Sequence, residues 1–184
     1  MTKQGVDHAI EFLKDEDVTI HLHNVSEESW GTILASVWKS TGIIVAMPTY
    51  EYKMYPPMAS LLEEISKKKV QNRKAFRIGS YGWSGGAQKE LNEIMTKYNT
   101  GWEFIEPVEY MGCPTNEDLK AIKKGVKQGV EQGIEQGIEQ GEKKKAIEIA
   151  KNLIDVLDIK TISMKTGLME EEVLALAAAH RSAG

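Results

Sequence analysis

Two short segments rich in aromatic residues and glycine carry the side chains best suited to holding a ligand. Met47–Tyr55 reads MPTYEYKMY, and Ser80–Ala87 reads SYGWSGGA. Glycine lets backbone N–H groups approach a ligand closely, and a tyrosine or tryptophan can stack on a planar ring. Together the segments predict a slot for a flat heterocycle, whereas the alternative is that these aromatics only fill the end of the fold. The candidate binding residues are Pro48, Thr49, Tyr50, Glu51, Tyr52, Ser80, Tyr81, Gly82, Trp83, Ser84, Gly85 and Gly86.

Each segment follows a run of residues typical of a buried strand. Gly42–Met47 is continuously apolar, Ala75–Ser80 precedes the second segment, and Val18–Val25 alternates apolar and polar residues. The other expected elements are helices over about 57–68 and 87–98, apolar helical spacing over 30–38 and a broken last strand over 102–105 and 108–111. Alternating strands and helices predict βαβ units and a mainly parallel sheet. Both segments then lie at strand carboxyl ends, where such sheets bind ligands.

Other residue types that could do chemistry stand without the partners they need. His21 and His23 share one side of the expected first strand, but no carboxylate motif accompanies them, so we interpret both as structural. Cys113 is the single cysteine, which excludes an intramolecular disulfide and a cysteine-based zinc site. We therefore expect no metal site and no catalytic residue in this chain.

The two loop motifs carry a resemblance to a known family. Met47-Pro48-Thr49-Tyr50, then Tyr55-Pro56-Pro57-Met58-Ala59, then Gly79–Ala87 occur in the expected strand–helix context. On these motifs, residues about 5–115 resemble the flavodoxin-like domain of flavodiiron proteins (A-type flavoproteins). The resemblance implies an α/β, flavodoxin-like three-layer fold, FMN as cofactor and electron transfer as function. It also implies that Pro48-Thr49-Tyr50 and the 81–86 loop flank the flavin ring, with backbone amides bonded to its polar edge.

Two parts of that family pattern are not found in this sequence. We find no metallo-β-lactamase-like domain and so expect no diiron centre. The chain also starts inside the expected first helix, whose apolar face is Val6, Ala9, Ile10 and Leu13. Strand 1 and the phosphate-binding loop of a flavodoxin-like domain would precede that helix. We therefore expect an N-terminally incomplete sheet, with strand edges left open or paired directly, and FMN binding that is weakened or lost.

The sequence changes character after Pro114. Gly125, Gly129, Gly133, Gly137 and Gly141 recur every fourth residue in a segment without proline. Each glycine inside a helix costs about 1 kcal/mol relative to alanine, so we expect a long helix that is weakly stable unless a partner covers its apolar stripe. Three short helical patterns follow. The predicted organisation is an incomplete flavodoxin-like domain over 1–115, a glycine-repeat connector over 116–144 and a small helical, helix-turn-helix-like tail over 145–184.

Residues about 125–180 resemble the tail of the recombination-promoting nuclease family, PD-(D/E)XK proteins described as putative transposases. The resemblance lies in the glycine repeat, Ala146–Leu153, Thr161–Leu168 and Glu171-Glu172-Val173. The acidic residues and lysine of a nuclease core are not found, so no nuclease activity is expected. Glu170, Glu171 and Glu172 would repel phosphates from the last helix. We expect self-association through the tail and regard nucleic-acid binding as disfavoured.

Composition limits the classes of function that the chain can have. The chain has 184 residues, with 23 Lys+Arg and 27 Asp+Glu for a net charge of −4, which gives no general attraction to nucleic acid or anionic membrane. No window has the roughly 18 apolar residues of a membrane span, and no secretory signal is recognised, so a cytoplasmic location is expected. The leading prediction is an FMN-binding electron-transfer domain with an unknown redox partner. The alternatives are a protein–protein interaction module without flavin or a DNA-associated accessory protein.

Overall fold

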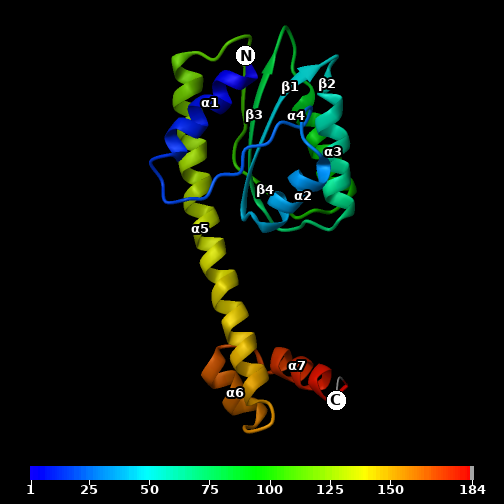
Figure 1. Cartoon of the computed structure of the whole chain (residues 1–184), viewed down its shortest axis with the longest axis vertical. Coiled ribbons are helices and arrows are strands. Elements are labelled where there is room, and N and C mark those ends of the chain that lie inside the picture. Colours follow the sequence, from blue (N-terminus) through cyan, green and yellow to red (C-terminus); the bar gives the residue numbers. More distant parts are fainter. Residues whose placement is uncertain (183–184) are drawn as a thin grey trace. The chain divides into compact units, whose positions relative to one another are not determined.

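The chain divides into two compact units in a computed structural model that describes residues 1–182 (Figure 1). The first unit runs from Met1 to Ile134, and the second begins at Glu135. Among the described residues, no helix has both the length and the apolar character needed to cross a bilayer. The boundaries that the sequence predicts at residues 115 and 144, between a domain, a connector and a tail, stay predictions.

The first unit is built on a mainly parallel sheet. Its strands are β1 (Gly42–Tyr50), β2 (Lys53–Met54), β3 (Lys74–Tyr81), β4 (Glu103–Phe104) and β5 (Val108–Met111). Central strand β3 pairs in parallel with β1 on one side and with the short β4 and β5 on the other. Only β2 is antiparallel, where it turns back on the end of β1. The parallel arrangement and the broken last strand agree with the sequence-based prediction.

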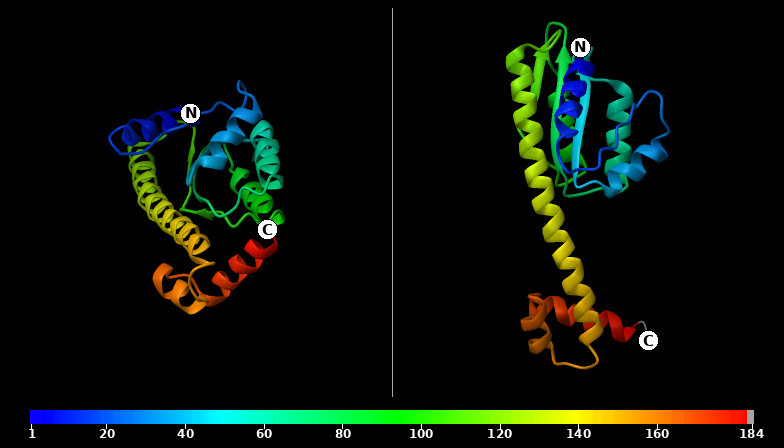
Figure 2. Two further views of the ribbon diagram at one scale, coloured as in Figure 1. Left: turned by 60° about the horizontal axis from the view of Figure 1, so that its bottom comes forward. Right: turned by 60° about the vertical axis from the view of Figure 1, so that its left-hand side comes forward.

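Helices cover both faces of this sheet (Figure 2). They are α1 (Thr2–Leu13), α2 (Trp30–Lys39), α3 (Pro56–Lys67), α4 (Ala87–Lys97) and the first part of α5 (Asn116–Leu153). Buried side chains of α2, α3 and α4 share one core with Ala75 of β3. On the opposite face, residues of α1 and α5 pack with the neighbouring Phe76 and with Ile78. Successive residues of β3 thus enter different cores, because side chains alternate along a strand.

The predicted strand over Val18–Val25 is wrong. This segment is extended but joins no ladder: Val18 packs on the α1 side of the sheet, and Val25 packs on the α2 side. Between them, Ile20 is 38% and Leu22 64% exposed, so the alternating apolar residues of this segment form no buried face. Within residues 1–182, no strand pairs with the outer edge of β1 from Gly42 to Pro48.

His23 fixes the end of this segment to α2. Its Nδ1 lies 2.7 Å from Glu28 Oε2, and its Nε2 lies 2.8 Å from Ser36 Oγ. The hydrogen bond from His23, with help from the Asn24 backbone N–H, holds the pKa of the Glu28 carboxyl below its usual value. These contacts support the interpretation of His23 as structural.

The second unit has its own small core. The last turns of α5, α6 (Ile159–Thr166) and α7 (Glu170–Ser182) surround the buried residues Ala150, Ile162, Leu168 and Val173. Asp158 caps α6 by accepting a hydrogen bond from the Thr161 N–H. Gly167 ends α6 with φ of 73°, a left-handed cap that glycine adopts without strain. Lys143 pairs with Glu172 at 2.7 Å, which lowers the pKa of that carboxyl.

Glycines at the start of the repeat allow α5 to lie close to the sheet. A Cβ on Gly125 would come within 2.5 Å of the Phe76 ring, and one on Gly129 within 3.2 Å of Ile105. Val126 beside them is buried, so this part of the apolar stripe is covered by the chain's own sheet. The early glycines therefore serve helix–sheet packing, whereas at Gly133 a Cβ would make only an ordinary contact with Thr41 at 3.7 Å.

This difference predicts opposite effects of alanine at two positions of one repeat. Gly125→Ala should lower the free energy of unfolding of the first unit by about 1–3 kcal/mol, because the helix must move away from Phe76. Gly133→Ala should raise it by up to about 1 kcal/mol through the higher helix propensity of alanine. Urea unfolding followed by tryptophan fluorescence reports this unit, because Trp30, Trp38, Trp83 and Trp102 all lie within it. Equal effects of the two substitutions would contradict the packing role of Gly125.

Candidate functional site

The first candidate loop is a tight hairpin at the carboxyl end of β1. Thr49 and Tyr50 pair with Met54 and Lys53 of β2, and the turn between them is Glu51-Tyr52. Both turn residues have positive φ, 47° for Glu51 and 63° for Tyr52. A side chain in this left-handed region is strained by about 1–2 kcal/mol, so surrounding contacts must hold the turn. The turn leaves the Tyr50 and Tyr52 rings exposed.

The second candidate loop, Tyr81–Gly86, joins β3 to α4. Trp83 is 83% exposed, the largest exposed fraction among the large apolar side chains described. Ser84 Oγ is buried and has no hydrogen-bond partner within residues 1–182, although a buried hydroxyl normally has one. No atom lies within 4 Å of a Cβ built on Gly82, so that side of the loop is open. An exposed aromatic ring and an unpartnered buried hydroxyl thus lie one residue apart.

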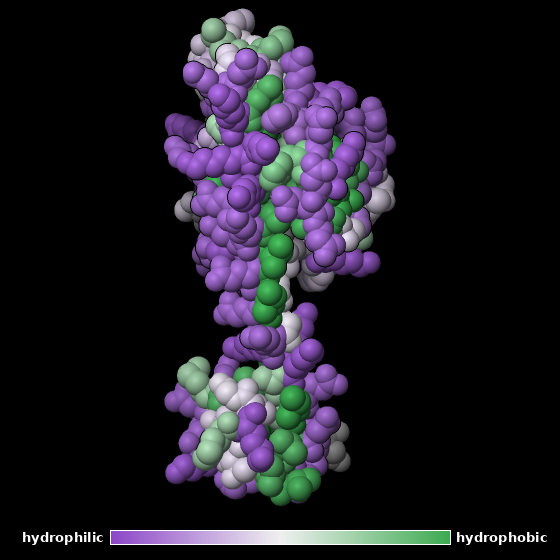
Figure 3. Space-filling model, turned by 90° about the vertical axis from the view of Figure 1, so that its left-hand side faces the viewer, coloured by the Kyte–Doolittle hydropathy of each residue, from purple (hydrophilic) through white to green (hydrophobic). Residues whose placement is uncertain are grey.

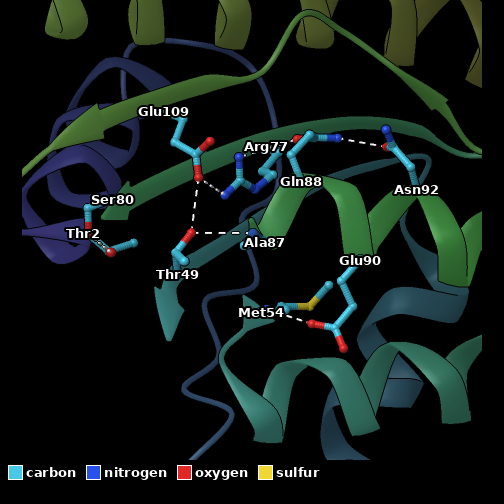
Figure 4. A network of polar contacts seen from close by, with 10 residues as sticks. All are labelled: Thr2, Thr49, Met54, Arg77, Ser80, Ala87, Gln88, Glu90, Asn92 and Glu109. Atoms are coloured by element: carbon cyan, nitrogen blue, oxygen red, sulfur yellow. Dashed lines mark hydrogen bonds and ion pairs between the residues drawn. The ribbon is translucent and has the colours of Figure 1, made fainter. Parts of the chain in front are cut away.

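The two loops touch each other through backbone atoms. A Cβ on Gly86 would overlap the carbonyl oxygen of Tyr52, so only glycine allows this approach. The Ala87 N–H donates a hydrogen bond to Thr49 Oγ1 at 3.3 Å, and the Met54 N–H donates to Glu90 Oε2 at 2.6 Å. The start of α4 is therefore bonded to both strands of the hairpin (Figure 4).

An ion pair lies beside the loops and was not among the residues predicted from sequence. Arg77 of β3 is fully buried, and its Nη2 lies 2.6 Å from Glu109 Oε1 of β5. Thr49 Oγ1 donates to the same carboxylate oxygen at 3.3 Å. The available sequence signal was an arginine inside an otherwise apolar or small strand, Ala75–Ser80, because such a position requires a buried partner.

Most of the predicted residues come together at this edge of the sheet. Pro48 to Tyr52 form one loop and Tyr81 to Gly86 the other, and Thr49 joins them. Ser80 lies apart, because its hydroxyl is 2.6 Å from Thr2 Oγ1 at the start of α1. Within residues 1–182, no group of three or more His, Cys, Asp and Glu side chains is placed to hold a metal ion.

The start of α1 lies at the same edge of the sheet. Tyr110 of β5 donates its hydroxyl to the Met1 carbonyl at 3.3 Å, and burial raises the pKa of this phenol. A Cβ on Gly5 would lie 2.6 Å from the same hydroxyl, so glycine permits the close approach of α1. The start of α1, at Met1 and Thr2, is thereby placed near the ends of β3 and β5.

Comparison with known proteins supports the flavodoxin-like fold. No protein-family model matches the chain. The anaerobic nitric oxide reductase flavorubredoxin of Pectobacterium atrosepticum is 38% identical over 111 residues, which are 60% of this chain and 21% of that protein. The chain thus spans about a fifth of the length of the curated relatives it matches.

Solved structures agree. Rubredoxin oxygen:oxidoreductase from Desulfovibrio gigas matches with a TM-score of 0.66 and 26% identity, over 71% of this chain and 32% of that one. An archaeal flavodoxin matches with a TM-score of 0.60 and 25% identity, over 71% of this chain and 89% of that one. The similar proteins include flavodiiron proteins and flavodoxins, and the predicted flavodoxin-like α/β fold is confirmed.

The contact between the loops predicts that Gly86 cannot be replaced. Gly86→Ala should lower the free energy of unfolding of the first unit by about 1–3 kcal/mol, because its Cβ would overlap the Tyr52 carbonyl. Gly82→Ala is the matched control in the same loop and should change stability by less than about 0.5 kcal/mol. Urea unfolding of both variants is the measurement. A Gly86→Ala variant as stable as Gly82→Ala would show that the loops do not touch.

Proposed function

We propose that the first unit binds FMN between its two loops and acts as an electron-transfer domain. The observation that carries this proposal is the loop pair itself: the loop with the exposed Trp83 and the unpartnered Ser84 hydroxyl meets the Tyr50–Tyr52 turn at Gly86. The proposal is also supported by the similar proteins, which include a flavorubredoxin and a flavodoxin. FMN would supply reversible electron transfer without help from a catalytic side chain.

The residues present fit a flavin ring in their chemistry. Trp83, Tyr50 and Tyr52 offer exposed rings that can pack on a planar heterocycle. Ser84 can satisfy its hydroxyl on a polar ring edge, and the backbone N–H groups of Gly82 and the residues around it can bond the ring oxygens and nitrogens. Pro48 and Thr49 would form the part of the ring site that lies on the hairpin, and Glu51 would add an acidic side chain beside them. In this proposal, all of these residues flank the ring.

We further propose that FMN binding is weak. The first turn of α1 can attract a phosphate, because a helix start presents free N–H groups and a partial positive charge. The hydroxyls at that start, however, already have protein partners: Thr2 Oγ1 lies 2.6 Å from Ser80 Oγ, and Tyr110 donates its hydroxyl to the Met1 carbonyl. Ring contacts would then supply most of the affinity. We expect a Kd above about 1 μM, corresponding to less than about 8.2 kcal/mol of binding free energy.

A flavin titration tests this proposal. FMN added to the full chain should quench tryptophan fluorescence with a Kd above about 1 μM, and Trp83→Ala should weaken binding about tenfold through loss of stacking. Trp38→Ala is the control, because Trp38 is 56% exposed on α2 and belongs to neither loop. Absence of binding at millimolar FMN would overturn the proposed function, and a Kd below 1 μM would overturn only its weakness.

Self-association is a second candidate function, and one observation favours the glycine-repeat connector as its surface. Self-association through the tail over 145–184 stays a prediction. Ile134 and Ile138 continue the apolar stripe of α5 but are 49% and 58% exposed, and Figure 3 shows hydrophobic side chains in line along this helix. A second copy of α5 could cover them. The likeness of the tail to recombination-promoting nucleases, an interaction role without flavin, DNA association, the redox partner and a cytoplasmic location all stay predictions.

Oligomeric mass tests self-association through the connector. If two copies pair through α5, Ile134→Lys with Ile138→Lys should convert a dimer to a monomer in light scattering, because buried lysines oppose association. Val156→Lys is the control, since Val156 is 73% exposed in the second unit and lies outside α5. A monomeric wild-type chain, or a dimer unaffected by the paired substitution, would contradict the proposal.

A further inference from the structure

The least expected side chain of the first unit is the arginine at the centre of its sheet. Arg77 lies opposite Val45 in the β1–β3 register, and its side chain is 0% exposed. Taking a charged group out of water costs several kcal/mol unless a partner and hydrogen bonds compensate. Its remaining hydrogen bond joins Nη1 to Gln88 Oε1 at 3.3 Å, while Nε has no partner. A charged group in a core therefore requires interactions that compensate the loss of water.

Because Gly79 has no side chain, the Arg77 guanidinium can extend over it toward the loops. A Cβ on Gly79 would lie 2.5 Å from Arg77 Nη2 and 2.9 Å from its Cζ. Residues 77 and 79 lie on the same face of β3, because side chains alternate along a strand. The Arg77 side chain therefore extends along the backbone over Gly79 toward the carboxyl end of the sheet, where both loops begin.

The Glu109 carboxylate, which pairs with Arg77, contacts both loops. Glu109 Oε1 accepts hydrogen bonds from Arg77 and from Thr49 of the hairpin, and Thr49 Oγ1 in turn accepts from the Ala87 N–H. Glu109 Oε2 lies 2.9 Å from the position of a Cβ on Gly85. The Glu109 side chain is 22% exposed, so it reaches the rim of the site. Figure 4 shows Thr49, Arg77 and Glu109 converging from three different strands.

We infer that Arg77 and Glu109 are positioning residues that hold the two loops in contact and set the charge that a bound ring faces. The part of this inference that concerns the ring rests on the proposed function, whereas the part that concerns the loops does not. The pair is neutral as a whole. Loss of Glu109 charge leaves a buried cation beside the loops, and loss of Arg77 leaves an anion. A flavin ring gains electron density on reduction, so the two losses act on it in opposite directions.

Amide hydrogen exchange tests the loop part without any flavin. In Arg77→Met and in Glu109→Gln, the Ala87 amide should exchange at least about tenfold faster than in wild type, because its acceptor Thr49 loses a fixed partner. The Met54 amide is the internal control: it bonds Glu90, not this network, and should change less than about threefold. Unchanged exchange at Ala87, or equal acceleration at both amides, would overturn the positioning role.

A second charged pair on the same strand provides the matched control variants. Lys74 and Glu103 pair at the opposite end of β3, where the Glu103 side chain is 70% exposed. Lys74→Met and Glu103→Gln make the same chemical changes far from the loops. Neither should accelerate exchange at Ala87 by more than about threefold. A loop response to these variants equal to that of Arg77→Met would also overturn the positioning role.

Flavin affinity in the two redox states tests the ring part. Relative to wild type, Glu109→Gln should favour binding of reduced FMN over oxidised FMN by about tenfold. Arg77→Met should favour oxidised FMN by about tenfold. Each change corresponds to about 30 mV in the reduction potential of a two-electron couple. The double variant should lie within about threefold of wild type. Shifts of the same sign, or none, in FMN-bound protein would overturn this part. A wild type that binds no FMN would overturn it together with the proposed function, while amide exchange still decides the loop part.

Discussion

The parallel register between β1 and β3 is the constraint on which the site depends. Gly42 pairs with Lys74 and Pro48 with Ser80, so both strands end at the same level. The segments that follow, the Tyr50–Tyr52 turn and Tyr81–Gly86, then begin side by side. A shift by one residue would turn Arg77 and Gly79 to the other face of the sheet, because side chains alternate with a period of two. Fold and candidate site are therefore fixed by the same backbone hydrogen bonds.

Three close approaches complete the arrangement, and each needs a glycine. Gly86 lets the second loop meet the Tyr52 carbonyl, Gly79 gives Arg77 its path, and Gly125 lets α5 lie against Phe76. These positions serve different purposes, namely a loop contact, a buried charge and a helix–sheet contact. Glycine at each allows a separation that any Cβ would prevent. The buried pair of Arg77 and Glu109 then ties the loops to the central strand.

Local patterns predicted β1, β3 and both loops, because apolar runs and glycine-rich turns are properties of neighbouring residues. The Val18–Val25 strand was wrong, since alternation cannot show whether the apolar side chains become buried, and Ile20 and Leu22 stay exposed. The pairing of Arg77 with Glu109 joins residues 32 positions apart and depends on the register of β5 against β3. The packing of Gly125 on Phe76 could not be predicted either, since a four-residue repeat looks the same whether its glycines face a sheet or solvent.

The most direct test of the central claim is to locate FMN on the first unit by amide chemical shifts in ¹⁵N spectra of the full chain. If the ring lies between the loops, the shifts that move with added FMN should be those of residues 49–52 and 82–87, with smaller changes at the start of α1. Shifts confined to the second unit or to the exposed faces of α2 and α3, or no shifts at millimolar FMN, would contradict a flavin site between the two loops.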